Sequence, residues 1–311
     1  MVDILQSNRS ILLTNDVETT SIVNHCLSDK TGKLVAEHAI PTILNLYFKH
    51  NIKSTFFVTG YFAEKFPEAV KLIHNSGHEI GCHGYSHEHT DGFDILDFKK
   101  QKEHLNHSKK ILEDIISDDV ISFRSPALRT NSYTATVLQE TGFKIDSSVS
   151  SQRFDFFFSL GSKEKLQWLK APRKPYFTSA YTLSKKGNNS ILEIPISAFI
   201  IPYIGTTMRI NPALIRTLRF FLMKESSRKG NPINFLIHPI ELITEEKTHA
   251  SIQRRSNNYL KYLLKDKLRH YLKIKNLGDN GVHLFEEQIN YFKKHDFKFK
   301  TCKEYYSEVI K

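Results

Sequence analysis

Short β-rich runs and longer helical patterns alternate regularly along the first two-thirds of the chain. Their hydrophobic spacing predicts strands at 11–14, 54–58, 78–82, 120–123 and 143–147, and helices at 39–50, 62–75, 94–116 and 132–140. The strand pattern resumes at 191–195 and 233–237. Repeated β-then-α units favour a parallel sheet with right-handed crossovers, and such a sheet closed on itself is a barrel. We therefore expect an α/β fold of the (β/α)-barrel type, with functional residues at the C-terminal ends of its strands.

The length of 311 residues suits one barrel of roughly 250 residues with insertions. Two stretches interrupt the alternation, around 150–190 and 245–280, and we expect inserted loops or helices there, the first as a lid. The core motifs fall within 10–240, and a closing strand and helix are expected within 282–311. The sequence therefore predicts a single domain over 1–311.

Cysteine usage and hydropathy bear on the compartment. The three cysteines, Cys26, Cys82 and Cys302, are scattered and form no CxxC pair, which argues against a disulfide framework and favours a reducing compartment. The N-terminus has no long apolar core, and no run approaches about 18 consecutive apolar residues. We therefore expect neither a signal peptide nor a transmembrane helix, and a cytoplasmic location.

The chain is basic, with a formal net charge of +11. This indicates an anionic partner, either nucleic acid, a membrane surface or a phosphorylated substrate, unless the charge only solvates the surface. No nucleic-acid motif appears, so nucleic acid is not expected. Residues 252–275 combine dense lysine and arginine with an apolar stripe, a pattern typical of a helix on an anionic membrane, and 213–224 offers a second apolar surface. The alternative is a helix packed on the barrel with its lysines in solvent.

Two motifs have the composition of a metal site. His83 and His87 are four residues apart, a spacing that puts both imidazoles on one face of a helical turn, although 15 histidines make chance matches easy. Asp16 and Glu18 end the first expected strand, where alternation points both carboxylates to one side. One carboxylate can then bind metal while the other acts as a base; an acidic turn capping the next element is the alternative.

In their order along the chain, these motifs resemble the polysaccharide deacetylase family, also called the NodB-homology domain. The matching segments are T-N-D-V-E at 14–18, the strand at 54–60, the run at 77–87, R-S-P at 124–126, D-S-S at 146–148 and L-I-H-P at 236–239. The resemblance covers roughly residues 10–240. It implies a distorted (β/α)-barrel of the NodB-homology type and a metal-dependent hydrolase that removes the N-acetyl, or N-formyl, group of an amino sugar.

The resemblance also implies a metal site. Glu18, His83 and His87 would hold a divalent cation, with zinc favoured and iron, cobalt, nickel or manganese also suited to the donors. The family pattern has adjacent aspartates, whereas Val17 separates the two acids here. Strand alternation favours Asp16 as general base and Glu18 as ligand. The competing assignment makes Asp16 the ligand and leaves the base unfilled.

Further roles follow from the same resemblance. Arg124 would keep the general base ionised and oriented, His238 would be the general acid, and Asp146 would orient His238. Pro126, Arg129 and Glu193 are the candidate substrate-binding residues. Arg129 is alternatively a surface arginine that pairs with a helix end, and Glu193 is alternatively structural.

The expected substrate follows from the expected compartment. A cytoplasmic enzyme reaches no finished extracellular polysaccharide, so we expect a nucleotide- or polyprenyl-linked amino sugar used in cell-surface polysaccharide synthesis. If 252–275 binds lipid, the protein is peripheral on the inner membrane face. The alternative function is hydrolysis of a non-sugar amide C–N bond on the same fold.

Overall fold

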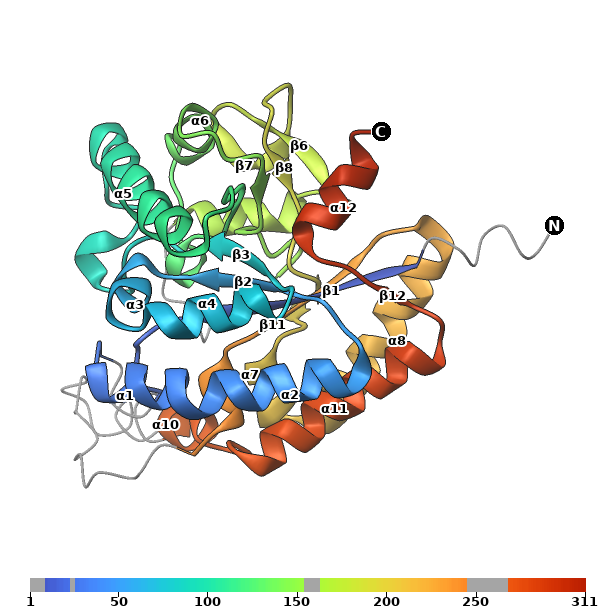
Figure 1. Cartoon of the computed structure of the whole chain (residues 1–311). Coiled ribbons are helices and arrows are strands. Elements are labelled where there is room, and N and C mark those ends of the chain that lie inside the picture. The colour runs from blue at the N-terminus through green and yellow to red at the C-terminus, as the bar shows by residue number, and fades with distance from the viewer. Residues whose placement is uncertain (1–8, 23–25, 154–162, 245–267) are drawn as a thin grey trace.

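A curled sheet forms the centre of the molecule in this computed structural model, which describes residues 9–22, 26–153, 163–244 and 268–311 (Figure 1). Within these residues the sheet has ten strands in the order β11-β1-β2-β3-β4-β5-β8-β6-β7, and β12 also pairs with β1. The parallel strands are β1 (Ser10–Val17), β2 (Thr55–Val58), β3 (Glu79–Cys82), β4 (Ser122–Phe123), β5 (Ile145–Asp146), β8 (Leu192–Glu193), β11 (Ile233–Ile237) and β12 (Lys298–Phe299).

Helices connect these strands and cover the outer side of the sheet (Figure 1). They are α1 (Asp29–Leu34), α2 (Ile40–His50), α3 (Gly60–Lys65), α4 (Pro67–Asn75), α5 (Phe98–Ile116), α6 (Thr134–Glu140), α7 (Gly205–Ile210), α8 (Pro212–Lys229), α10 (Leu268–Lys273), α11 (Asp279–Lys294) and α12 (Cys302–Val309). In Figure 1, α2 and α11 lie side by side, and the Tyr47 and Phe285 rings meet edge-on between them. None of the helices among the described residues is long and apolar enough to cross a membrane.

The expected alternation of strands and helices is confirmed, with local differences. The single helix expected at 62–75 is two helices, α3 and α4, which part at Phe66. Proline at position 67 has no N–H to continue the helical ladder, so it begins a new helix instead. The Thr59 side chain caps α3 by accepting a hydrogen bond from the Phe62 N–H, which starts that helix at Gly60.

The sheet curls like a barrel but its strands do not close a full ring. Between β8 and β11 the chain makes only sparse contacts: the Ser197 N–H donates to the Asn234 carbonyl at 3.0 Å, and Ile204 forms a single bridge with Leu236. The fold is therefore a distorted barrel, as expected, with its weakest seam between these two strands.

The two irregular stretches differ from expectation where they are described. Instead of a loop-like lid, 150–190 contains a hairpin of β6 (Tyr176–Ser179) and β7 (Thr182–Lys186), and β6 joins β8 antiparallel. The sheet is therefore mixed rather than purely parallel. Residues 245–267, which include most of the basic stretch at 252–275, lie outside the described residues. The closing helix α11 begins at Asp279, and β12 pairs with the start of β1.

Candidate active site

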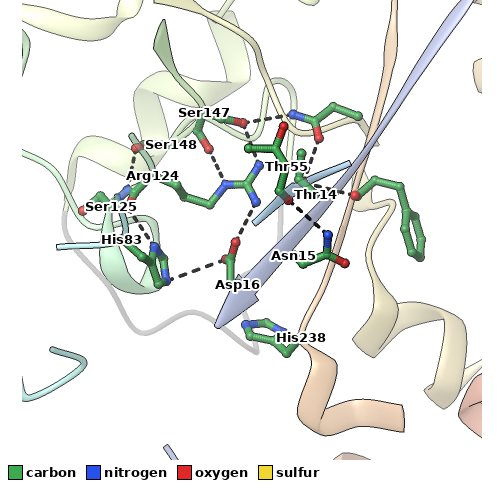
Figure 2. Close-up of polar contacts among 12 residues, drawn as sticks. Thr14, Asn15, Asp16, Thr55, His83, Arg124, Ser125, Ser147, Ser148 and His238 are labelled. Atoms are coloured by element: carbon green, nitrogen blue, oxygen red, sulfur yellow. Dashed lines mark hydrogen bonds and ion pairs between the residues drawn. The ribbon is translucent and has the colours of Figure 1, made fainter. Parts of the chain in front are cut away.

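The C-terminal end of β1 brings two buried carboxylates to one side of the sheet. Asp16 and Glu18 are 3% and 9% exposed. Arg124, at the end of β4, donates from Nη1 to Asp16 Oδ1 at 2.7 Å. Figure 2 shows Arg124, His83 and His238 around the Asp16 carboxylate. Residues expected from separate strand ends thus converge at one place, which is where a (β/α)-barrel concentrates its chemistry.

Arg124 is fully buried and all three of its nitrogens are bound. Besides Asp16, it donates from Nε to the Ser147 carbonyl at 2.8 Å and from Nη2 to Ser147 Oγ at 2.7 Å. Its guanidinium also lies 4.3 Å from the centre of the Phe57 ring. Burial alone raises the pKa of Asp16, but the Arg124 charge, with His83 and His238, holds that pKa below its ordinary value. Asp16 is therefore ionised at neutral pH.

His83 has its tautomer set by the backbone. Its Nδ1 lies 2.7 Å from the Arg124 carbonyl, which can only accept, so Nδ1 carries the proton and Nε2 presents a lone pair. Burial lowers the pKa of His83 to about 4, which keeps the ring neutral. The expected helical turn from His83 to His87 is wrong: this segment is a loop after β3. Gly84 turns it with φ +66°, in close contact with Pro126 and Phe93.

The His87 imidazole lies between His83 and Glu18. Its Nε2 lies 3.1 Å from His83 Nε2 and 3.0 Å from Glu18 Oε2. Burial alone raises the pKa of Glu18, but His87 and the other two histidines lower it to about 2, so this carboxylate is ionised. Of the three facing atoms, only His87 Nε2 can therefore carry a proton.

This donor set has the chemistry that a divalent cation requires. His83 Nε2 and Glu18 Oε2 present lone pairs, and His87 Nε2 between them offers a third once its proton leaves. Within the described part of the chain, no three or more His, Cys, Asp or Glu side chains are spaced so that they could hold a metal ion as they stand. The three residues nevertheless fit a cation by their type, tautomer and charge, because a cation would replace the shared proton.

His238 approaches the same carboxylates from β11. Its Nε2 lies 3.8 Å from Glu18 Oε1, and its Nδ1 bonds Glu241 Oε1 at 2.9 Å. Burial opposes protonation, but the hydrogen bond and charge of Glu241, together with Asp16 and Glu18, raise the pKa of His238 to about 9. His238 is therefore cationic at neutral pH and is 25% exposed.

Glu241 is in turn held by Arg209. Arg209 Nε donates to Glu241 Oε2 at 2.7 Å, and both side chains are almost fully buried. Burial raises the pKa of Glu241, but Arg209 and His238 lower it to about 2. Gly205 allows this packing, because a Cβ at that position would lie 2.6 Å from Glu241 Oε2. Arg209 also donates to the Lys273 and Lys275 carbonyls, which ties this pair to the end of α10.

The expectation that Asp146 orients His238 is wrong, because Glu241 occupies that position. Asp146 accepts from Ser148 Oγ at 2.6 Å and shares a hydrogen bond with the Glu193 carboxyl group. Burial raises the pKa of both acids, and that of Glu193 lies well above its usual range, so this carboxyl is neutral. Glu193 is fully buried and accepts from the Val149 N–H, which favours its structural alternative over contact with substrate.

Pro126 and Arg129 lie beside the site without direct contact to its carboxylates. Pro126 is buried against Gly84. Arg129 Nε pairs with Asp94 Oδ1 at 2.8 Å, and Asp94 belongs to a turn rather than a helix end. Their contact with substrate stays a prediction.

The sequence interpretation missed Glu241, Arg209 and Ser147. The spacing of His238 and Glu241, three residues apart, was a usable signal, because a 3₁₀ turn at Pro239–Leu242 places them on one side. Arg209 carried no such signal, since only the tertiary structure brings α7 to the end of β11.

The comparisons with known proteins agree with this geometry. Residues 8–145 match the family model for polysaccharide deacetylase. Over this region the chain is similar to the polysaccharide deacetylases. It is 30% identical over 127 residues to a peptidoglycan deacetylase of Helicobacter pylori, a match that covers 41% of this chain and 42% of the relative. The alignment thus spans about two-fifths of that relative's length.

Solved structures of family members and of an allantoinase share the fold. A structure from Pseudomonas aeruginosa PAO1, assigned to the polysaccharide deacetylases, has a TM-score of 0.60 at 16% identity and covers 95% of this chain and 89% of its own. The PuuE allantoinase has a TM-score of 0.57 at 15% identity and covers 96% and 88%. Identities this low show the fold alone, so the fold does not select between these two reactions.

The buried pair of Arg124 and Asp16 predicts a pH-dependent loss of stability. Arg124→Met leaves the Asp16 charge buried without its partner, which should lower the free energy of unfolding at neutral pH by about 3–5 kcal/mol. The depressed pKa of Asp16 contributes stability that is present above its unfolded value and is lost as the pH falls. The deficit of the variant should therefore shrink in acid, as measured by urea unfolding at neutral and acidic pH.

A surface pair provides the control for that experiment. Arg216 pairs with Glu287 at 2.7 Å but is 54% exposed, so Arg216→Met should destabilise the protein far less than Arg124→Met. Equal losses of stability in Arg124→Met and Arg216→Met would show that the Arg124 pair has no special role.

Glu241→Gln should lower the pKa of His238. The raised pKa means that His238 binds its proton more tightly when folded, so its contribution to stability is complete below about pH 6.5 and disappears as the pH rises through about 9. In metal-free protein, NMR titration of the His238 ring protons should show a downward shift in the variant. Glu286→Gln, at the surface pair with His50, is the control and should leave His238 unchanged. An unchanged His238 titration in Glu241→Gln contradicts this assignment.

Proposed function

We propose that this chain is a metal-dependent hydrolase that removes the N-acetyl, or N-formyl, group from an amino sugar. The observation that carries the proposal is the meeting of an ionised Asp16, a protonated His238 and a convergent donor set at one end of the sheet. An acid and a base of opposite protonation state beside one electrophilic centre are what hydrolysis of an amide requires. The similarity of residues 8–145 to the polysaccharide deacetylases supports the substrate class.

Glu18, His83 and His87 would hold the cation, with zinc favoured and iron, cobalt, nickel or manganese also suited to two nitrogens and a carboxylate. When bound, the cation polarises the amide carbonyl and lowers the pKa of a water molecule. The position of Glu18, within 3.0 Å of His87 and away from Arg124, supports its assignment as ligand over the competing assignment of Asp16.

Asp16 would act as the general base. Its Oδ1 is held by Arg124, whereas Oδ2 faces the site at 3.8 Å from His83 Nε2. Asp16 accepts a proton from water as the water oxygen forms a bond with the carbonyl carbon. Because Arg124 fixes one oxygen, the other is oriented toward the reacting water.

His238 would act as the general acid. With Nδ1 held by Glu241, its protonated Nε2 faces the site and donates to the leaving nitrogen as the C–N bond breaks. The products are a carboxylic acid and a free amino sugar. The elevated pKa suits this role, because the proton is present at neutral pH before the reaction begins.

For the substrate, we propose a cytoplasmic amino sugar on a nucleotide or polyprenyl phosphate carrier. The net charge of +11 favours a phosphorylated ligand. The Helicobacter pylori relative is named for peptidoglycan, so peptidoglycan fragments belong in the same substrate panel. The PuuE allantoinase shares the fold, so a small cyclic amide in the panel tests the alternative of a non-sugar substrate.

Asp16→Asn and His238→Ala should each lower kcat by about 10²- to 10⁴-fold, because each removes one proton-transfer partner. Release of acetate or formate, measured over the panel with added zinc, is the readout. Both variants should retain bound metal, since neither residue is assigned as a ligand. Full activity in either variant rules out its assigned role.

His87→Ala should lose metal as well as activity. Removing one of three ligands weakens binding, whereas the His89→Ala control, two residues away in the same loop region, should bind metal as the unmodified protein does. Metal content after dialysis, measured by elemental analysis, checks this independently of turnover. Retention of a stoichiometric cation by His87→Ala would exclude the proposed ligand set.

A further inference from the structure

Four large apolar side chains gather on the solvent side of α8 and of the strand pair β9 (Ala198–Phe199) and β10 (Ile201–Pro202). Phe199, Ile200, Phe220 and Phe221 are 47%, 58%, 42% and 45% exposed. The Phe199 and Phe221 rings stack with centroids 5.6 Å apart and planes 14° apart, and Phe220 meets Phe221 edge-on at 5.7 Å. We call these four residues the phenylalanine patch.

The patch is not needed to hold α8 on the fold. The opposite side of that helix buries Ile215, Leu218 and Leu222, and Arg219 stacks on Tyr291 of α11 at 3.7 Å. Figure 1 shows α8 beside α11. One apolar stripe is enough to anchor a surface helix, so packing of α8 does not require the side chains of Phe220 and Phe221. The helix thus packs on the barrel and also exposes the second apolar surface that the sequence indicated at 213–224.

Ile200 adds a second unusual feature. Its φ of +65° lies in the left-handed region, which a β-branched residue rarely adopts. The side chain is more than half exposed, so burial does little to offset this local cost. An exposed apolar residue held in this way at the tip of a hairpin is available for contact outside the fold.

The rim of the patch is positively charged. Lys224 Nζ lies 4.3 Å from the Phe220 ring centre, and the exposed Arg228 follows one turn later on α8. Arg173 lies 5.7 Å from the Phe199 ring but is bound to Glu225. Among the described residues, neither Lys224 nor Arg228 forms an ion pair with a carboxylate. These two cations are therefore free to meet an anionic partner.

We propose that the phenylalanine patch docks on the surface of an anionic lipid bilayer. The four apolar side chains enter the boundary between headgroups and acyl chains, while Lys224 and Arg228 lie at the level of the phosphates. Binding to an anionic bilayer requires apolar side chains that enter the acyl region and cations at the level of the phosphates. Recognition of a glycan also requires hydrogen-bonding groups around the stacked rings. The proposal does not depend on the reaction proposed above, or on residues 252–267.

Vesicle flotation of the full chain tests this proposal. The protein should float with vesicles that contain phosphatidylglycerol, remain in solution with pure phosphatidylcholine, and dissociate as salt is added. The double variant Phe199→Ser, Phe221→Ser should weaken binding by at least about tenfold, because it removes two aromatic side chains that the bilayer would bury. Lys224→Glu should weaken it by about fivefold or more. The control Phe48→Ser removes an 88% exposed phenylalanine on α2 and should have no effect.

Thermal unfolding and turnover of a soluble substrate show whether each variant is folded, and they report on the proposed reaction separately from lipid binding. Failure of the unmodified protein to bind phosphatidylglycerol vesicles overturns the proposal. So does undiminished binding by the double phenylalanine variant, which would place the lipid contact elsewhere in the chain. Retention on insoluble peptidoglycan, without flotation, that is lost in the double phenylalanine variant would assign the patch to a glycan instead.

Discussion

Arg124 carries a full positive charge into the interior of the sheet, where its side chain is fully buried. The arrangement of the site follows from how that charge is satisfied. Asp16 supplies the opposite charge, and Ser147 accepts hydrogen bonds through both its carbonyl and its hydroxyl group. A buried ion pair is favourable only when such further hydrogen bonds offset the cost of removing both charges from water. The geometry of Asp16 is therefore set by the interior of the barrel and not by the surface around it.

The network extends from Ser147 across the sheet. The Ser147 hydroxyl donates to the Ile194 carbonyl and accepts from Asn234 Nδ2 at 3.0 Å, and Thr14 donates to Asn234 Oδ1. Strands β1, β4, β5 and β11 are thus joined by polar side chains inside an otherwise apolar core. Because every link is buried, a shift of one strand would leave a polar group unpaired, at a cost of about 1–3 kcal/mol. This makes the site rigid even though the sheet does not close.

Electrostatics divide the site into two halves. Arg124 keeps Asp16 ionised, and Glu241 keeps His238 protonated, although the two groups share one small region of low polarity. Their partners lie on opposite sides: Arg124 is held by the loop after β5, whereas Glu241 is held by Arg209 from α7. Separate supports allow one site to hold a base and an acid at the same pH. The Arg209 contacts with the Lys273 and Lys275 carbonyls also couple the acid to the end of α10.

The sequence by itself determined the order of strands and helices, and it determined which residues stand at the strand ends. Both can be inferred from hydrophobic periodicity and from the order of residues along the chain, which are properties of short sequence segments. Asp16, Glu18, His83, Arg124 and His238 were predicted correctly as neighbours for this reason, since parallel strands bring their C-terminal ends to one edge.

Tertiary structure decided the partners of those residues. Several outcomes depend on distances between segments that are far apart in the chain. They include the choice of Glu241 over Asp146 as the partner of His238, the burial of Glu193, and the pairing of the hairpin at 176–186 with β8. The loop that joins His83 to His87 has the spacing of a helical turn, but its course is set by tertiary contacts: Gly84 packs against Pro126, and the Gly84 carbonyl accepts from the Gly60 N–H. Spacing constrains which residues share a strand or turn, but burial and the need to satisfy each buried polar group select the final contacts.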